Sequence, residues 1–171
     1  HMPAAAIRAQ VGEAVWAGYF KFCVVRNPYD ALVSAYRHFG AAAAVAAGSS
    51  RGYLRNLFAR PKAGGGRPGP PPRDDFGRWL QSVRLPLDRN KYLIDGQFCL
   101  DHVIRYESLL AGIEEVCGRL GLPFDPRRLP KLKVREKSPW PVADYYSPAS
   151  VEIVERAYRT EFDLFGYARP W

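Results

Sequence analysis

The sequence predicts an α/β fold with a short parallel sheet. An apolar run from Phe20 to Val25 has the composition of a strand that is covered on both faces of a sheet, and it leads directly into a helix. A second apolar run, from His102 to Tyr106, is also followed by a helical pattern. Strands that alternate with helices are typical of α/β domains.

The first helix of this pattern has a well-marked start. Asn27 suits the N-cap, Pro28 suits the first helical position, and Asp30 falls at the third, where its carboxylate can reach back to the cap. The helix is predicted over residues 28–43. Its packed side carries the apolar residues Leu32, Ala35, Tyr36 and Phe39.

The junction between strand and helix is a candidate anion site. Free backbone N–H groups and the helix dipole favour negative charge at a helix start. Arg26 stands at the end of the strand, and Ser34 lies further along the polar face of the helix, with Asp30 and Arg37. Phosphate or sulfate would bind at Arg26 and Ser34. A capped helix beside a solvated arginine is the alternative from these residues alone.

The remaining elements are predicted from helical periodicity and from residues that begin or end helices. A helix is predicted over residues 3–12, followed by a connector, and a Gly/Pro-rich flexible loop over about 46–73. Asp74 or Asp75 begins a short helix. Its apolar residues are Phe76, Trp79, Leu80 and Val83. A further helix runs from Ser108 to Leu120, with a core stripe of Leu109, Ile113, Val116, Cys117 and Leu120. The last helix starts at Ser147 and buries Val151, Val154, Tyr158 and Phe162.

Composition limits the function classes. With 171 residues, 47% of them apolar, the chain has the length of one domain, 1–171, and enough apolar side chains for a core. A net charge of +8 favours polyanionic ligands. Nucleic acid is not predicted, because no aromatic–basic interleaving or helix-turn-helix pattern occurs. No run is apolar enough to span a bilayer, and no signal region is visible. Three cysteines without metal-ligand spacing indicate a reducing, cytoplasmic location.

One motif resembles a known family. Arg26-Asn27-Pro28-Tyr29-Asp30, with Ser34-Ala35-Tyr36, is similar to the 3′-phosphate-binding motif of sulfotransferases that use 3′-phosphoadenosine 5′-phosphosulfate (PAPS). In that family the arginine and a serine eight positions later hold the 3′-phosphate of the cofactor. The segments 101–109 and 157–167 resemble later segments of the carbohydrate-type branch, in the same order.

The resemblance implies a fold and an activity. The fold is the P-loop-NTPase-like sulfotransferase fold, a three-layer α/β/α arrangement with a short parallel sheet. The activity is transfer of a sulfuryl group from PAPS to a hydroxyl or amine of a carbohydrate or small-molecule acceptor, with adenosine 3′,5′-bisphosphate as the product. No metal is required by this scheme.

The chain also departs from the family pattern. The strand–loop–helix that cradles the 5′-phosphosulfate is not visible before Arg26, so the N-terminal βα unit is expected to be missing. Gly64-Gly65-Gly66 is no substitute, because prolines surround it and no Gly-Lys-Ser/Thr follows. Either the sequence begins late in its gene, or the chain is a remnant that cannot bind PAPS alone. The competing function is a non-catalytic basic module, from a truncated sulfotransferase-like domain, that binds a nucleotide or polyanion. A homodimer would cover exposed strand edges.

Further site candidates rest on the same resemblance. His1-Met2-Pro3 resembles the tripeptide that carries the general base of the cytosolic sulfotransferases, although a cleaved expression tag also leaves His-Met. Tyr106 resembles the tyrosine that contacts adenine, and a tyrosine packed at the core rim is the alternative. Arg135 and Lys137 lie in a basic loop that either neutralises cofactor phosphates or is simply solvated.

Overall fold

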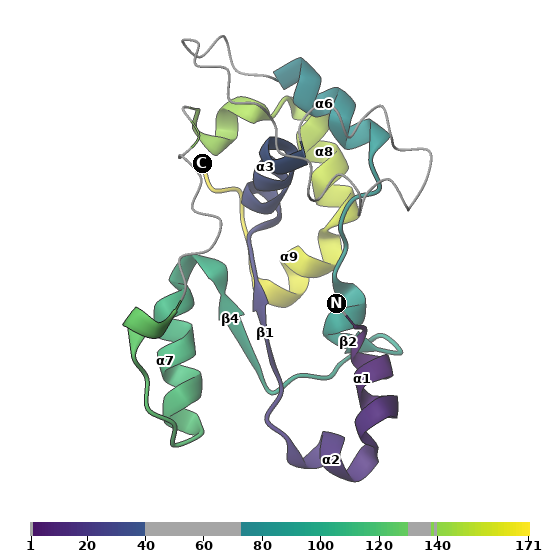
Figure 1. Ribbon diagram of the computed structural model, residues 1–171. Helices are drawn as coiled ribbons and strands as arrows, with labels where there is room; N and C mark the ends of the chain where they lie inside the picture. Colours follow the sequence, from purple (N-terminus) through teal and green to yellow (C-terminus); the bar gives the residue numbers. More distant parts are fainter. Residues whose placement is uncertain (1, 40–72, 130–137, 139) are drawn as a thin grey trace. The chain divides into compact units, whose positions relative to one another are not determined.

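The computed structural model describes residues 2–39, 73–129, 138 and 140–171 (Figure 1). The chain divides into two compact units. The first unit is His1–Arg26 with Pro86–Val134, and the second is Asn27–Leu85 with Arg135–Trp171. That the two units act as one domain over residues 1–171 stays a prediction, and the loop predicted at about 46–73 lies almost entirely outside the described residues.

The first unit contains the predicted parallel strands. β1 (Phe22–Val25) pairs with β4 (His102–Arg105), and the register runs from Phe22 opposite His102 to Val25 opposite Arg105. Figure 1 shows the two strands side by side, with α7 (Leu109–Arg119) next to β4. The prediction of a short parallel sheet with helices following the strands is therefore confirmed.

Helix α7 packs closely on β4 at a glycine. Gly112 faces Ile104, which is 1% exposed, and a Cβ atom at Gly112 would overlap Cγ2 of Ile104 and lie 3.2 Å from its Cβ. The helix ends as predicted at Gly121, whose φ is +65°. The Leu122 N–H donates to the Cys117 carbonyl at 2.8 Å, as in a Schellman ending. The predicted core stripe is wrong at its end, because Leu120 follows the last helical turn and is 43% exposed.

The first unit also holds elements that sequence reasoning placed incompletely. α1 (Ala4–Val11) matches the predicted first helix, but the predicted connector contains a second helix, α2 (Glu13–Gly18). β2 (Leu93–Ile94) and β3 (Gln97–Phe98) form an antiparallel hairpin. The positive φ angles of Asp95 (50°) and Gly96 (78°) are those of a type I′ turn. The 3₁₀ turns of this unit are Arg89–Lys91, Tyr106–Ser108 and Pro126–Arg128.

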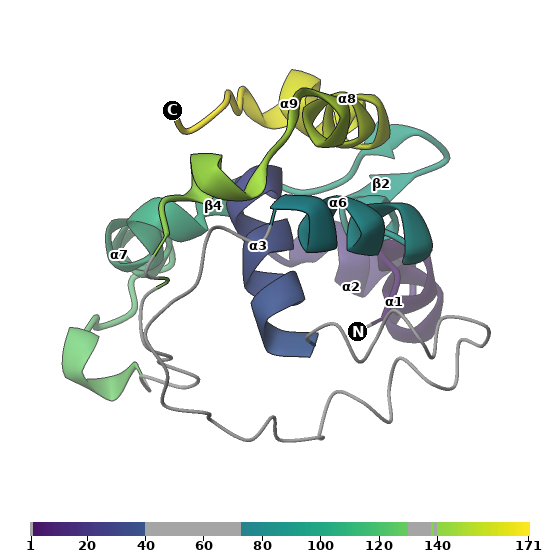
Figure 2. The same cartoon turned by 90° about the horizontal axis from the view of Figure 1, so that it is seen from above.

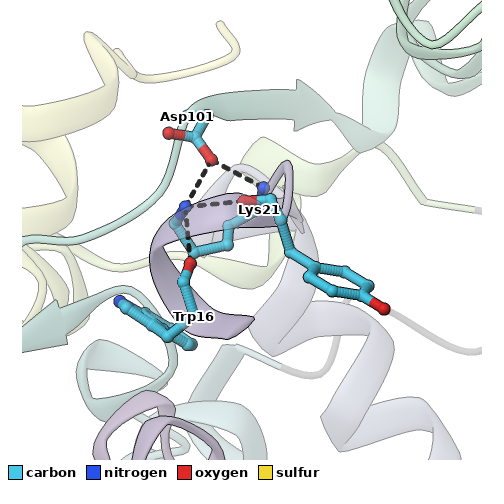
Figure 3. A network of polar contacts seen from close by, with 4 residues as sticks. Trp16, Lys21 and Asp101 are labelled. Atoms are coloured by element: carbon cyan, nitrogen blue, oxygen red, sulfur yellow. Dashed lines mark hydrogen bonds and ion pairs between the residues drawn. The ribbon is translucent and has the colours of Figure 1, made fainter. Parts of the chain in front are cut away.

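The starts of β1 and β4 are joined by a polar network around Lys21 (Figure 3). The Lys21 backbone N–H donates to Oδ2 of Asp101 at 2.7 Å, and its ammonium lies 2.8 Å from the same oxygen. The ammonium also donates to the carbonyl oxygens of Trp16 and Tyr19. In return, the Lys21 carbonyl accepts the N–H groups of Asp101 and His102. Lys21 therefore fixes the register at which the parallel strands begin.

The second unit is helical. Its elements are α3 (Pro28–Phe39), α6 (Arg73–Ser82), the 3₁₀ turn Val142–Tyr145, α8 (Pro148–Ala157) and α9 (Arg159–Phe165). α6 packs against α8, and α9 continues from α8 in the yellow end of the chain (Figure 2). The buried core consists of Tyr29, Leu32, Val33, Phe76, Trp79, Leu80, Tyr145, Tyr146, Val151, Val154 and Tyr158.

Most sequence predictions for this unit are confirmed. α3 packs through Leu32, which is 0% exposed, and α6 through Phe76, Trp79 and Leu80. The predicted end of α3 at residue 43 lies outside the described residues. The predicted last helix is two helices, because the chain turns at Tyr158, where φ is −105° and ψ is 20°.

One prediction about β1 is wrong. Its apolar run was expected to be covered on both faces, but the alternate residues Phe22 and Val24 are 46% and 47% exposed. The other side chains of the strand, Cys23 and Val25, are half-buried. This alternation along β1 shows that packing covers one face of the strand more than the other.

Candidate functional site

The junction after β1 begins with a helix cap. The Asn27 side-chain oxygen accepts the Tyr29 N–H at 3.1 Å, and the Asn27 carbonyl accepts the Ala31 N–H at 2.9 Å. Asn27 is 8% exposed, so these bonds form away from water. Asn27 is therefore the predicted N-cap of α3, and Pro28 takes the first helical position.

The parallel register of the first unit places Arg26 beside Tyr106. Val25 and Arg105 are the last paired residues of the two strands, so Arg26 and Tyr106 leave the sheet at the same level. The guanidinium carbon of Arg26 lies 4.5 Å from the centroid of the Tyr106 ring, within cation–π range. Tyr106 is 48% exposed, so part of the ring remains accessible. Ligands of open α/β sheets bind at this carboxyl edge of the strands.

Ser34 lies in the second unit. It is exposed on α3, opposite the face that carries the buried Leu32 and Val33, as the helical spacing predicts. Its hydroxyl is therefore accessible to a ligand. Arg26 is the last residue of the N-terminal segment of the first unit. The chain runs from Arg26 through Asn27 and the first turns of α3 to Ser34.

The other predicted site residues lie outside the described part of the chain. These are His1, Arg135 and Lys137. Their roles as general base and phosphate-neutralising cations stay predictions.

Sequence reasoning missed the contacts that support the positions of Arg26 and Asn27. Lys21 and Asp101 set the strand register that brings Arg26 to Tyr106. The side-chain N–H of Asn27 donates to the Ala168 carbonyl at 2.9 Å, a contact between residues 141 positions apart. Lys21 interrupts the first predicted strand and Asp101 stands directly before the second, and opposite charges at these two positions are the signal that could have marked the pair.

Residues 2–39, 73–129, 138 and 140–171 were searched for clusters of side chains that bind metal ions. No group of three or more His, Cys, Asp or Glu side chains there could hold a metal ion. Within the same residues, no helix has the length and apolar character needed to cross a membrane.

The thiol of Cys23 in β1 is held in its neutral form. Burial, with the nearby Cys99 thiol, raises its pKa from 9.0 to about 11. All three cysteines, each in a described part of the chain, are free thiols. A neutral, half-buried thiol is a poor nucleophile, so Cys23 is unsuited to carry a covalent intermediate.

This pKa gives a measurable reactivity. At about pH 8, the thiolate fraction of Cys23 is expected to be about a hundredfold smaller than that of a thiol with the ordinary pKa. Alkylation of the Cys23 peptide by iodoacetamide, followed by mass spectrometry, should be slow at this pH and accelerate up to about pH 11. Free cysteine under the same conditions is the control. If the alkylation rate of Cys23 levelled off at the same pH as that of free cysteine, the raised pKa would be contradicted.

Comparison with known proteins identifies the family. The model of the sulfotransferase family matches residues 7–168, which is most of the chain. The chain therefore belongs to the sulfotransferase family, and this membership supports a role as a transferase. Neither the curated proteins nor the solved structures gave a match.

Proposed function

We propose that this protein transfers a sulfuryl group from PAPS to a hydroxyl or amine of a carbohydrate or small-molecule acceptor. The observation that carries the proposal is the meeting of Arg26 and Tyr106 at the carboxyl edge of the parallel strands, directly before the capped start of α3. Family membership over residues 7–168 supports the reaction class.

Arg26 and Ser34 have the chemistry that the 3′-phosphate of PAPS requires. A guanidinium donates charge-assisted hydrogen bonds to phosphate oxygens, and its planar fork suits two of them. The Ser34 hydroxyl, which is exposed on α3, can donate one more. The accessible part of the Tyr106 ring offers a surface on which adenine can stack, while Arg26 holds the ring.

The transfer step depends mainly on the positioning of PAPS and the acceptor and on stabilisation of the charge that develops. The acceptor oxygen or nitrogen forms a bond to sulfur as the sulfur–oxygen bond to the 5′-phosphate breaks, and the electron pair of the broken bond stays on adenosine 3′,5′-bisphosphate. The acceptor proton passes to a base, for which His1 is the candidate. Arg135 and Lys137 would neutralise the phosphates. The free thiols agree with a reducing compartment, so we place the reaction in the cytoplasm.

A transfer assay separates the enzyme from a binding module. The protein is incubated with PAPS labelled with radioactive sulfur and a panel of neutral and acidic oligosaccharides, and labelled product is separated by chromatography. We expect label on an acceptor, and loss of most of this label in Ser34→Ala. Tight binding of adenosine 3′,5′-bisphosphate without transfer to any acceptor would favour the non-catalytic basic module instead.

A further inference from the structure

Residues 168–171 contact the first turn of α3 within the second unit. The Asn27 side chain uses both ends of its amide: its oxygen caps the Tyr29 N–H, and its N–H donates to the Ala168 carbonyl. Because a single rigid amide makes both bonds, the backbone at Ala168 helps to fix the orientation of the N-cap. The cap and residues 168–171 are thus mechanically joined.

Aromatic rings make a second connection to the same turn. Trp171 meets the Tyr29 ring edge-on, with centroids 5.0 Å apart, and stacks on Tyr146 at 5.4 Å. The Tyr146 hydroxyl donates to the Tyr29 carbonyl at 2.9 Å. Tyr29 is 1% exposed, whereas Trp171 is 49% exposed. Trp171 therefore covers the outer side of a buried ring on the first turn of α3.

A charged pair makes the third connection. Arg169 donates to Oε1 of Glu155 through Nε at 2.8 Å and through Nη2 at 2.6 Å. The Tyr29 hydroxyl donates to the same oxygen at 3.1 Å. The Arg169 hydrogen bonds lower the pKa of the Glu155 carboxyl, so it stays charged to a lower pH than an ordinary glutamate. Glu155 thus joins α8, Arg169 and the ring of Tyr29.

We infer that residues 168–171 are a positioning segment for the start of α3, acting through Asn27 and Tyr29. The motif that resembles a phosphate site then has two sets of residues. Asn27 and Tyr29 are buried and bind residues 168–171, whereas Arg26 is half-buried and Ser34 is exposed. The effect on ligand affinity rests on the proposed function, while the effect on the order of α3 does not.

The test compares Trp171→Ala with Trp171→Phe and a matched control, Leu164→Ala. Leu164 is an exposed apolar residue of α9, so its loss removes a side chain from the same region without touching the rings. Hydrogen exchange of the Tyr29 and Ala31 amides is measured by NMR under native conditions, and affinity for adenosine 3′,5′-bisphosphate by calorimetry. Asn27→Ser is a second variant, because it keeps a capping oxygen and removes the N–H that binds Ala168.

We expect Trp171→Ala and Asn27→Ser each to speed exchange at Tyr29 and Ala31 by about fivefold or more, the equivalent of one lost contact. Affinity should fall by a similar factor, Trp171→Phe should restore both quantities, and Leu164→Ala should change neither. Unchanged exchange would overturn the inference. So would exchange that rises equally in α6 and α8, because a general loss of stability acts on the whole unit.

The affinity arm tests the positioning of the site. Faster local exchange with unchanged bisphosphate affinity in the variants would overturn the positioning role. If the wild-type protein fails to bind adenosine 3′,5′-bisphosphate, the proposed function fails, and the exchange rates of Tyr29 and Ala31 still decide whether residues 168–171 order α3.

Discussion

Replacing Arg26 with alanine is expected to weaken the binding of adenosine 3′,5′-bisphosphate by about tenfold to a hundredfold. A hydrogen bond to a charged group contributes about 1.5–3 kcal/mol, and each 1.4 kcal/mol is about a factor of ten. The measurement is isothermal titration calorimetry at fixed ionic strength, because phosphate contacts weaken as salt rises. Arg26→Lys keeps the charge and loses the planar fork, so its affinity should lie between those of the wild-type protein and Arg26→Ala.

Arg105→Ala is the matched control for this loss of charge. Arg105 is exposed on β4, next to the site in sequence but paired with Val25 in the sheet. Its removal lowers the net charge by the same amount and should change the affinity far less. If Arg105→Ala and Arg26→Ala weakened binding equally, the protein's overall positive charge would explain the affinity, and the specific role of Arg26 would be wrong.

Gly112→Ala is expected to destabilise the first unit by about 1–3 kcal/mol, the usual cost of forcing an extra carbon into a packed core. Alanine is the better helix former by up to about 1 kcal/mol, so steric overlap with Ile104 must exceed this gain. The overlap cannot be relieved by rotation of a flexible chain, since Ile104 is β-branched and 1% exposed. Urea-dependent hydrogen exchange in β4 and α7 measures the free energy of unfolding of this unit.

Two further variants isolate the contact. Gly118 lies on the same helix with open space around its Cα, so Gly118→Ala should leave stability unchanged or raise it. In an Ile104→Ala background, Gly112→Ala should become close to neutral, because the new methyl group occupies the space left by the isoleucine. Equal destabilisation by Gly112→Ala in both backgrounds would show that α7 does not rest on Ile104.

The sequence was sufficient where one local pattern decides the structure. The N-cap at Asn27, the buried face of α6 and the end of α7 at Gly121 were all predicted, because capping residues, helical periodicity and a glycine with positive φ act over a few residues. The Asp95-Gly96 hairpin belongs to the same class. Its dipeptide is a strong turn signal, and reading it together with the short flanking runs would have found β2 and β3.

Other features depend on contacts between distant residues and could not be predicted. The contact of Arg26 with Tyr106 follows from the parallel register of β1 and β4, which pairs residues 80 positions apart in the sequence. No local pattern encodes that register. The bond from Asn27 to Ala168 joins residues that are even further apart in the sequence, by 141 positions. The break at Tyr158 has neither proline nor glycine to mark it, so α8 and α9 were predicted as one helix.

The most direct test of the central claim compares two nucleotides that differ only in the 3′-phosphate. The wild-type protein and Arg26→Ala are each titrated with adenosine 3′,5′-bisphosphate and with adenosine 5′-phosphate. We predict that the wild-type protein binds the bisphosphate at least about tenfold more tightly, and that this preference nearly disappears in Arg26→Ala. Equal affinity of the wild-type protein for both nucleotides, or a preference that survives the loss of Arg26, would contradict a 3′-phosphate site at the end of β1.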